Sequence, residues 1–158
     1  MRVGNGFDAH PLQPGRKLIL GGVHVPYEKG LAGHSDSDVA THAIIEALLG
    51  ASGAGDIGRY FPPSDARYKD VSSLELLAQV RNLLIQRKWR IGNIDVTIVA
   101  ERPRLSPYVP EIRKRLAAIL RIDEGQVNVK SKSTNGLGYE GKGEGISAYA
   151  VALLEPKR

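Results

Sequence analysis

Two histidines and one aspartate carry the most recognisable chemistry in this sequence. Asp8 and His10 are two residues apart in a segment with strand-like character, so their side chains are expected on the same side of the strand. His42 lies in a segment with helical periodicity. Two imidazoles and one carboxylate are donors typical of a catalytic zinc site, which keeps one position open for water or substrate. The residues themselves leave another interpretation open, in which His42 is a hydrogen-bonded histidine of the core.

Two aspartates precede His42 along the chain. Asp38 is four residues before His42, which places both on one face of a helix. A metal-bound imidazole usually donates its other N–H to a carboxylate or carbonyl, so Asp38 is expected to accept that bond or to lie closer to the ion. For Asp36 we favour a simpler role, in which an acid stabilises the positive end of a helix.

Three further segments have residue types suited to a phosphorylated ligand. Residues 53–63 form a glycine-rich loop around Asp56, and residues 100–106 lead from the end of a strand into a helix. Helix N-termini attract anions, and ligands bind in concave sites with a few well-placed polar groups. Residues 130–136 combine hydroxyls, amines and an amide. Each segment could also be an ordinary polar turn, so their combination with the metal-ligand residues is what indicates function.

Length and composition fit one globular domain of ordinary type. The chain has 158 residues, of which 42% are apolar and 25% charged. The 22 basic and 17 acidic residues give a formal charge of +5, but the bases are scattered and the run at residues 113–115 has no stacking aromatics beside it. The charge is therefore weak evidence for nucleic-acid binding, and a phosphorylated small molecule explains it equally well.

The absence of cysteine excludes disulfides and thiolate–metal chemistry. The apolar runs are too short to cross a bilayer, and no signal peptide precedes the first predicted strand. We therefore expect a cytoplasmic protein without a membrane partner.

The elements that must position these residues follow from periodicity. Strands are predicted at residues 1–9, 18–20, 23–25, 94–100, 126–131 and 146–154, with a tight turn at 21–22. Gly4 and Gly6 indicate a close backbone approach or a bend in the first strand. The strands and interposed helices predict a sheet covered by helices on one face, in an α+β or α/β fold.

Three helices are predicted between these strands. The first spans residues 39–49, with Ser35 or Asp36 as its cap and Gly50 after its end. The second has apolar residues at helical spacing from Leu76 to Leu84. The third begins at Ser106-Pro107, and its predicted buried face is Val109, Ile112, Leu116 and Ile119.

Four separated motifs together resemble one known family. They are Gly6-Phe7-Asp8-Ala9-His10, residues 34–42, Gly55-Asp56-Ile57-Gly58, and residues 138–146. Their order and their spread over the whole chain are very specific, and the chain resembles the 2-C-methyl-D-erythritol 2,4-cyclodiphosphate synthase family. The resemblance implies one α+β domain over residues 1–158, with a mixed β-sheet, helices on one face, and a chorismate-mutase-like homotrimer whose active sites lie between subunits.

The activity implied by this resemblance is an intramolecular phosphoryl transfer. It converts 4-diphosphocytidyl-2-C-methyl-D-erythritol 2-phosphate to 2-C-methyl-D-erythritol 2,4-cyclodiphosphate and releases CMP, as a phosphorus–oxygen lyase of non-mevalonate isoprenoid biosynthesis. The nucleophile is an already anionic phosphate oxygen. Positioning and charge stabilisation are therefore needed more than a strong base.

The resemblance also assigns roles to residues. Asp8, His10 and His42 would bind Zn²⁺, and a Mg²⁺ or Mn²⁺ ion would bridge the substrate phosphates. His34 and Ser133 would stabilise the transition state. The residues expected to contact substrate are Asp8, His10, His34, Ser35, Asp56, Ile57, Gly58, Phe61, Asp65, Ala100, Pro103, Arg104, Leu105, Ser106, Lys132, Ser133, Thr134, Asn135, Tyr139 and Lys142.

Four positions depart from the family pattern. Asn135 stands where glutamate commonly binds the second ion, which predicts weaker magnesium binding. Pro63 replaces a common acid, and Ser133 replaces a threonine but keeps the hydroxyl. Lys142 replaces an arginine, which exchanges a planar fork of donors for a point charge.

Two other functions compete with this one. A non-catalytic trimeric protein that binds nucleotides or isoprenoid diphosphates and retains a metal site would explain Asn135. A zinc hydrolase using metal-bound water would need a general base, and no Glu or His stands in a suitable place near the metal motif.

Overall fold

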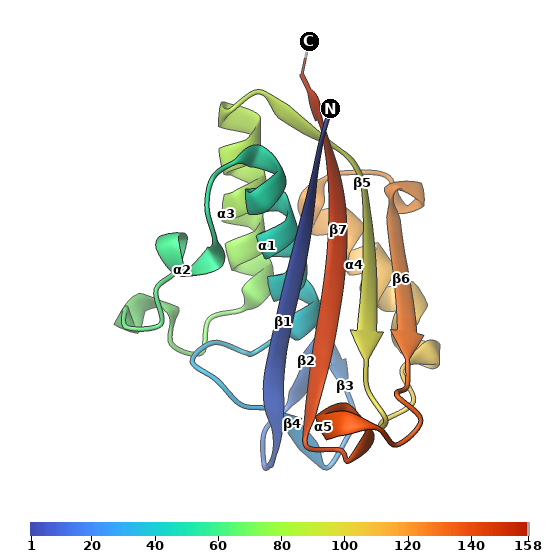
Figure 1. Ribbon diagram of the computed structural model, residues 1–158. Coiled ribbons are helices and arrows are strands. Elements are labelled where there is room, and N and C mark those ends of the chain that lie inside the picture. Colours follow the sequence, from blue (N-terminus) through green and yellow to red (C-terminus); the bar gives the residue numbers. More distant parts are fainter. Residues whose placement is uncertain (158) are drawn as a thin grey trace.

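The fold is a five-stranded sheet with helices packed against one face (Figure 1). The structure is a computed structural model and describes residues 1–157. The strands are β1 (Arg2–Pro14), β2 (Leu18–Leu20), β3 (Val23–Val25), β4 (Lys29–Leu31), β5 (Trp89–Val99), β6 (Val127–Lys132) and β7 (Gly145–Pro156). The helices are α1 (Val39–Ser52), α2 (Ile57–Tyr60), α3 (Ser73–Gln86), α4 (Val109–Leu120) and α5 (Gly138–Gly141), with 3₁₀ turns at Ala66–Tyr68, Ser106–Tyr108 and Glu124–Gln126.

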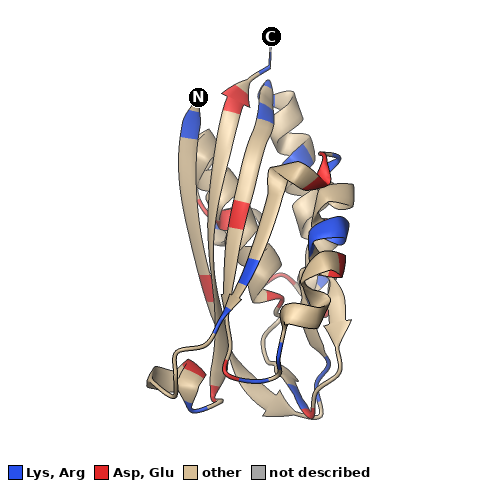
Figure 2. Ribbon diagram, turned by 90° about the vertical axis from the view of Figure 1, so that its right-hand side faces the viewer, with Lys and Arg blue, Asp and Glu red and all other residues tan. Residues whose placement is uncertain are grey.

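The sheet is mixed, as the family resemblance implied. Its order is β4-β1-β7-β5-β6, in which β5 and β6 run parallel and the other neighbours antiparallel. A parallel pair needs a crossover connection, and α4 lies within the one between β5 and β6. Figure 2, an edge-on view, shows the sheet and the helices as two layers, with basic residues scattered over both. The predicted hairpin of β2 and β3 is also present.

Helix α1 approaches β1 closely because two strand positions are glycine. A Cβ atom added to Gly6 would lie 1.9 Å from the carbonyl oxygen of Ala43, and one added to Gly4 would lie 2.0 Å from that of Ala47. Both distances are far shorter than any real contact, so only glycine permits this packing. The two glycines therefore mark a close backbone approach, which brings the start of α1 next to the middle of β1.

The core lies between the sheet and the helices. Along β7, every second residue from Ile146 to Leu154 is buried, the period expected of a strand with one covered face. Three of these residues are alanines, which leave room for α1. The opposite face of the sheet carries exposed apolar side chains, among them Val3, Phe7, Tyr149 and Val151.

Several predicted boundaries were wrong. β1 continues past Ala9 to Pro14 because its end pairs with β4. β5 begins at Trp89, five residues before the predicted start, and a register shift between Ile91 and Asn93 interrupts its regular pairing with β7. Such an irregularity breaks the alternation from which a strand is predicted.

The predicted ends of α1 were also wrong. Its N-cap is Asp38, whose side chain accepts from the backbone N–H of Thr41, in place of Ser35 or Asp36. Ser37 has a left-handed backbone with φ 58°, so the helix cannot begin earlier. At the other end the helix passes Gly50 and stops at Gly53, which is left-handed with φ 69°.

Helix α4 begins later than predicted and buries a slightly different face. Ser106–Tyr108 form a 3₁₀ turn, and α4 starts at Val109. Ile112 and Leu116 are buried as expected, but Val109 and Ile119 are only partly buried and Ala117 and Leu120 take their place. Within residues 1–157, no helix is long and apolar enough to cross a membrane.

Candidate active site

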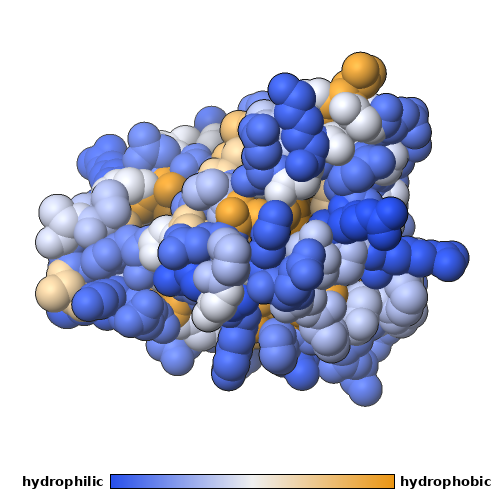
Figure 3. All heavy atoms as spheres, turned by 90° about the horizontal axis from the view of Figure 1, so that it is seen from below, coloured by the Kyte–Doolittle hydropathy of each residue, from blue (hydrophilic) through white to orange (hydrophobic). Residues whose placement is uncertain are grey.

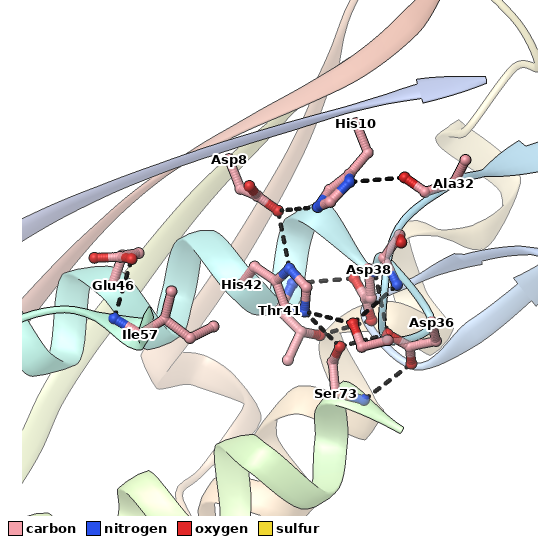
Figure 4. Close-up of polar contacts among 12 residues, drawn as sticks. Asp8, His10, Ala32, Asp36, Asp38, Thr41, His42, Glu46, Ile57 and Ser73 are labelled. Atoms are coloured by element: carbon pink, nitrogen blue, oxygen red, sulfur yellow. Dashed lines mark hydrogen bonds and ion pairs between the residues drawn. The ribbon is translucent and has the colours of Figure 1, made fainter. Parts of the chain in front are cut away.

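Asp8, His10 and His42 form the cluster that the sequence predicted (Figure 4). Asp8 and His10 project from β1, and His42 lies in the first turn of α1. The Asp8 Oδ2 atom is 3.2 Å from Nε2 of His10 and 2.9 Å from Nδ1 of His42. Each of the three residues offers one ligand atom, and these atoms all lie within 4.8 Å of one another. The cluster is only partly buried, so it remains accessible.

The hydrogen bonds of His10 indicate which of its nitrogens is free. Its Nδ1 lies 2.9 Å from the carbonyl oxygen of Ala32. A carbonyl only accepts, so Nδ1 donates to it, and Nε2, the nitrogen that faces Asp8, is the one that would bind a metal. A carbonyl partner of this kind is typical of metal-binding imidazoles.

Electrostatics keep Asp8 ionised. Burial raises the pKa of Asp8, but hydrogen bonds and charge interactions with His10 and His42 outweigh burial, so the net shift is downward. The same hydrogen bond to Asp8 raises the pKa of His10. The carboxylate therefore attracts a cation, whether a proton on an imidazole or a metal ion.

The donor set fits a divalent metal. In a tetrahedral site with zinc–ligand bonds of about 2.0–2.2 Å, neighbouring donor atoms are about 3.3 Å apart. The two measured separations from Asp8 Oδ2, 3.2 and 2.9 Å, are near this value. Two nitrogens and one oxygen leave a tetrahedral ion with a free position.

A cavity of about 220 Å³ opens beside the cluster. His34 and Ser35 line it, on the loop between β4 and α1. The Nε2 atom of His34 is 3.0 Å from the backbone oxygen of Asp65, which fixes the ring orientation. The guanidinium of Arg16 donates to the backbone oxygens of Leu31 and Ser35, and so holds the start and the middle of this loop.

The glycine-rich loop forms the other side of this cavity. Ile57, Gly58 and Phe61 line it, whereas Asp56 caps α2 by accepting from the N–H of Arg59 at 3.0 Å. Glu46 accepts from the N–H of Ile57 at 3.2 Å, and burial raises the pKa of Glu46. Glu46 was not predicted from the sequence, although it stands four residues after His42 on α1 and helical spacing offered that signal.

Two predicted site residues have side chains committed elsewhere. Asp65 pairs with Arg67 at 2.7 Å, and hydrogen bonds from Arg67 lower the pKa of Asp65. Only its backbone oxygen contacts His34. Asp38, expected beside His42 or the ion, is fully buried and accepts from the N–H groups of Gly21 and Gly22, so that prediction was wrong. Burial, together with the Asp36 charge, raises the pKa of Asp38.

The strand-end segments form a second cavity of about 290 Å³. Its lining consists of Ala100, Glu101, Pro103, Arg104, Leu105, Ser106, Ser131, Lys132 and Ser133. It shares no lining residue with the cavity beside the metal-ligand cluster. The fold therefore brings the predicted residues together in two groups. Seen from below (Figure 3), this end of the molecule is mostly hydrophilic, with apolar atoms between polar ones near the centre and an apolar side chain projecting at one edge.

Ser133 and Asn135 form a local turn at the rim of the second cavity. The hydroxyl of Ser133 accepts from the N–H of Asn135 at 3.0 Å, and Thr134 donates to the backbone oxygen of Leu137 at 2.5 Å. Asn135 has a left-handed backbone with φ 55°, a conformation that asparagine tolerates better than glutamate. This conformation gives a local reason for asparagine at this position.

Tyr139 and Lys142 lie on α5 and at its end. Tyr139 lines a third cavity with His10, and its hydroxyl contacts that of Ser147. Lys142 is exposed at the end of α5.

Comparison with known proteins assigns the chain to a family. A family profile described as the YgbB family matches residues 1–155. The chain belongs to the YgbB family. This YgbB chain is 56% identical over 154 residues to the 2-C-methyl-D-erythritol 2,4-cyclodiphosphate synthase of Pelotomaculum thermopropionicum, a match that covers 98% of this chain and 95% of that one. The resemblance drawn from the four motifs is thereby confirmed.

Solved structures share the YgbB fold. The Plasmodium falciparum IspF, described as a CDP complex, superposes with a TM-score of 0.87 at 34% identity and covers 99% of this chain and 97% of its own. The bifunctional IspDF of Campylobacter jejuni has a TM-score of 0.95 at 36% identity, and the match covers 98% of this chain. This chain spans only 42% of that longer protein. The α+β fold with a mixed sheet is thus shared with both structures.

Proposed function

We propose that the protein converts 4-diphosphocytidyl-2-C-methyl-D-erythritol 2-phosphate to 2-C-methyl-D-erythritol 2,4-cyclodiphosphate and releases CMP. In this reaction an oxygen of the 2-phosphate bonds to the β-phosphorus, and the bond from that phosphorus to the oxygen of CMP breaks. The observation that carries the proposal is the Asp8, His10 and His42 cluster, open to a cavity in a chain whose relatives are named for this activity. The protein would be a phosphorus–oxygen lyase of one domain, residues 1–158, in the cytoplasm.

The metals belong to this proposal. Asp8, His10 and His42 would hold Zn²⁺, and Mg²⁺ or Mn²⁺ would accompany the substrate phosphates. A zinc ion held there would supply Lewis-acid polarisation of the β-phosphate and neutralisation of negative charge.

The chain's own residues would orient the substrate and stabilise charge. His34, whose ring is held by the Asp65 carbonyl, and the hydroxyl of Ser133 would stabilise the transition state. Asp56, Ile57 and Gly58, with Phe61 and Asp65, would hold the methylerythritol part, and Glu46 would fix this loop through Ile57. Residues 100–106 would enclose the cytosine. Contacts from Lys132, Thr134, Asn135, Tyr139 and Lys142 would complete the site. Such positioning is the main demand of phosphoryl transfer.

A homotrimer with sites between subunits would unite the two groups of residues. The cavity beside the metal-ligand cluster and the cavity at the strand ends share no residue within one chain. The uncovered sheet face exposes 49% of Phe7, 52% of Tyr149 and 48% of Val151, a contiguous apolar surface of the kind that marks interfaces. Packing of this face against two copies is the arrangement we propose.

Release of CMP tests the activity. Purified protein, loaded with zinc and supplied with magnesium, is expected to release CMP and form a cyclic diphosphate, followed by chromatography and ³¹P NMR. An acyclic phosphate product would favour the zinc hydrolase. Failure to release CMP, with the fold and the metal intact, would favour the non-catalytic binding protein and overturn the proposal.

A further inference from the structure

A series of three hydrogen-bonded side chains leads from His42 through Ser73 to Asp36, away from the metal-ligand cluster (Figure 4). The Nε2 atom of His42 is 2.7 Å from Oγ of Ser73, the first residue of α3. The same hydroxyl contacts Oδ1 of Asp36, and the backbone N–H of Ser73 donates to Oδ2 of Asp36 at 2.9 Å. Ser73 is fully buried. The Ser35 hydroxyl also approaches Nε2 of His42, but at the longer distance of 3.3 Å.

The direction of these hydrogen bonds follows from Asp36, the last of the three side chains. An ionised carboxylate only accepts, so the single hydroxyl proton of Ser73 goes to Asp36. The Ser73 oxygen then accepts, and the N–H on Nε2 of His42 donates to it. Nδ1, the atom 2.9 Å from Asp8 Oδ2, is consequently the nitrogen of His42 whose lone pair would face a bound metal ion.

We infer that Ser73, held by Asp36, is a positioning residue that fixes the ring and the protonated nitrogen of His42 for metal binding. The inference rests on the proposed role of His42 as a metal ligand. Ser73 does for His42 what the Ala32 carbonyl does for His10. The contact to His10 comes from the backbone, whereas the contact to His42 comes from the Ser73 side chain held by that of Asp36. Substitution can therefore remove the contact to His42. Asp36 is therefore more than an acid near a helix start, the role expected from the sequence.

Zinc affinity in the absence of substrate tests the inference. Ser73→Ala removes the acceptor for His42 and should weaken zinc binding about 10- to 100-fold in a chelator competition. Ser73→Thr keeps the hydroxyl and should restore most of the affinity. Ser72→Ala is the matched control, because the neighbouring Ser72 makes no side-chain cap bond and should leave affinity unchanged. The absorption bands of the Co²⁺-substituted protein should shift in Ser73→Ala and not in Ser72→Ala.

The outcomes separate this inference from the proposed function. Equal zinc affinity and identical Co²⁺ spectra in Ser73→Ala and the parent protein would overturn the positioning role and leave the metal site standing. A parent protein that does not bind zinc would overturn the metal site itself. If Ser73→Ala does not fold by circular dichroism, Asp36→Asn decides instead. It keeps the shape but replaces one of the two oxygens that accept from Ser73 with an NH₂ donor, so it should weaken zinc binding, and parental affinity in this variant would contradict the inference.

Discussion

At the scale of single residues, the metal-ligand cluster depends on which imidazole nitrogen faces Asp8. On β1 the free atom of His10 is Nε2, because the Ala32 carbonyl occupies Nδ1. On α1 the facing atom of His42 is Nδ1, because Ser73 occupies Nε2. Each histidine ring is thus held by a hydrogen bond at the nitrogen that does not face Asp8. Metal binding therefore has to order the ring less.

Replacement of His42 by alanine should abolish zinc retention and turnover together, because two remaining donors do not make a stable tetrahedral site. Metal content by mass spectrometry and CMP release measure the two effects. The matched control is His24→Ala, since His24 is exposed on β3 and should be dispensable for both. Full activity or full zinc content in His42→Ala would refute its role as a ligand.

Replacement of Asn135 by glutamate should lower the magnesium concentration needed for half-maximal rate, because a carboxylate attracts the second ion more strongly than an amide. The left-handed backbone at Asn135 should make the same change destabilising by about 1 kcal/mol. Magnesium titrations of the rate and thermal melting measure these effects. Asn82→Glu adds the same charge on an exposed position of α3 and serves as control. An unchanged magnesium requirement would mean that residue 135 does not contact the ion.

The sequence was sufficient for the metal-ligand residues and insufficient for their supports. Asp8 and His10 share a strand face because side chains alternate along a strand. His42 was predicted as the third ligand because its motif occurs together with the others. Ser73 is a serine at a helix start, a very common feature, and its partner His42 is 31 residues away. No local pattern connects two such positions, because only the packing of α3 against α1 brings them together.

At the scale of elements, the position of His42 depends on how closely α1 packs against β1. Gly6→Ala would place a methyl group 1.9 Å from the Ala43 carbonyl oxygen, so the helix must shift. We expect a loss of about 1–3 kcal/mol in the free energy of unfolding, as for other overpacked cores, measured by urea denaturation. Zinc affinity should fall as well, because Ala43 is adjacent to His42.

Gly125→Ala is the control for this substitution. Gly125 has open space around its added Cβ and lies in the 3₁₀ turn Glu124–Gln126, so stability and zinc affinity should stay near those of the parent protein. Parental stability in Gly6→Ala would show that the contact between α1 and β1 adjusts without cost.

Element types were predictable from periodicity, and their ends were not. Regular alternation or helical spacing gave the centres of α1, α3, β5 and β7. The ends depend on partners that are remote in sequence, as where the end of β1 pairs with β4 or Asp38 accepts from the Gly21 and Gly22 amides. A cap that also holds a hairpin cannot be recognised from the helix sequence alone.

At the scale of the whole molecule, one chain presents the metal-ligand cluster and the strand-end loops as separate cavities. If each active site joins the metal side of one subunit to the loop side of the next, two different inactivating substitutions can complement each other. His42→Ala damages only the metal side, and Ser133→Ala damages only the loop side. Each variant alone should therefore form trimers with very low activity.

Mixed trimers of these two variants should regain activity. Co-expression with two different affinity tags, followed by purification on both, isolates trimers that contain each variant at least once. In a cyclic trimer of either composition, one of the three interfaces joins an intact metal side to an intact loop side, so we expect about one third of the parental rate of CMP release. If each site were formed within one chain, every site would carry a damaged half. The mixed trimers would then be as inactive as trimers of either variant alone. Activity at that low level would therefore contradict the inter-subunit site, even if the protein is a trimer.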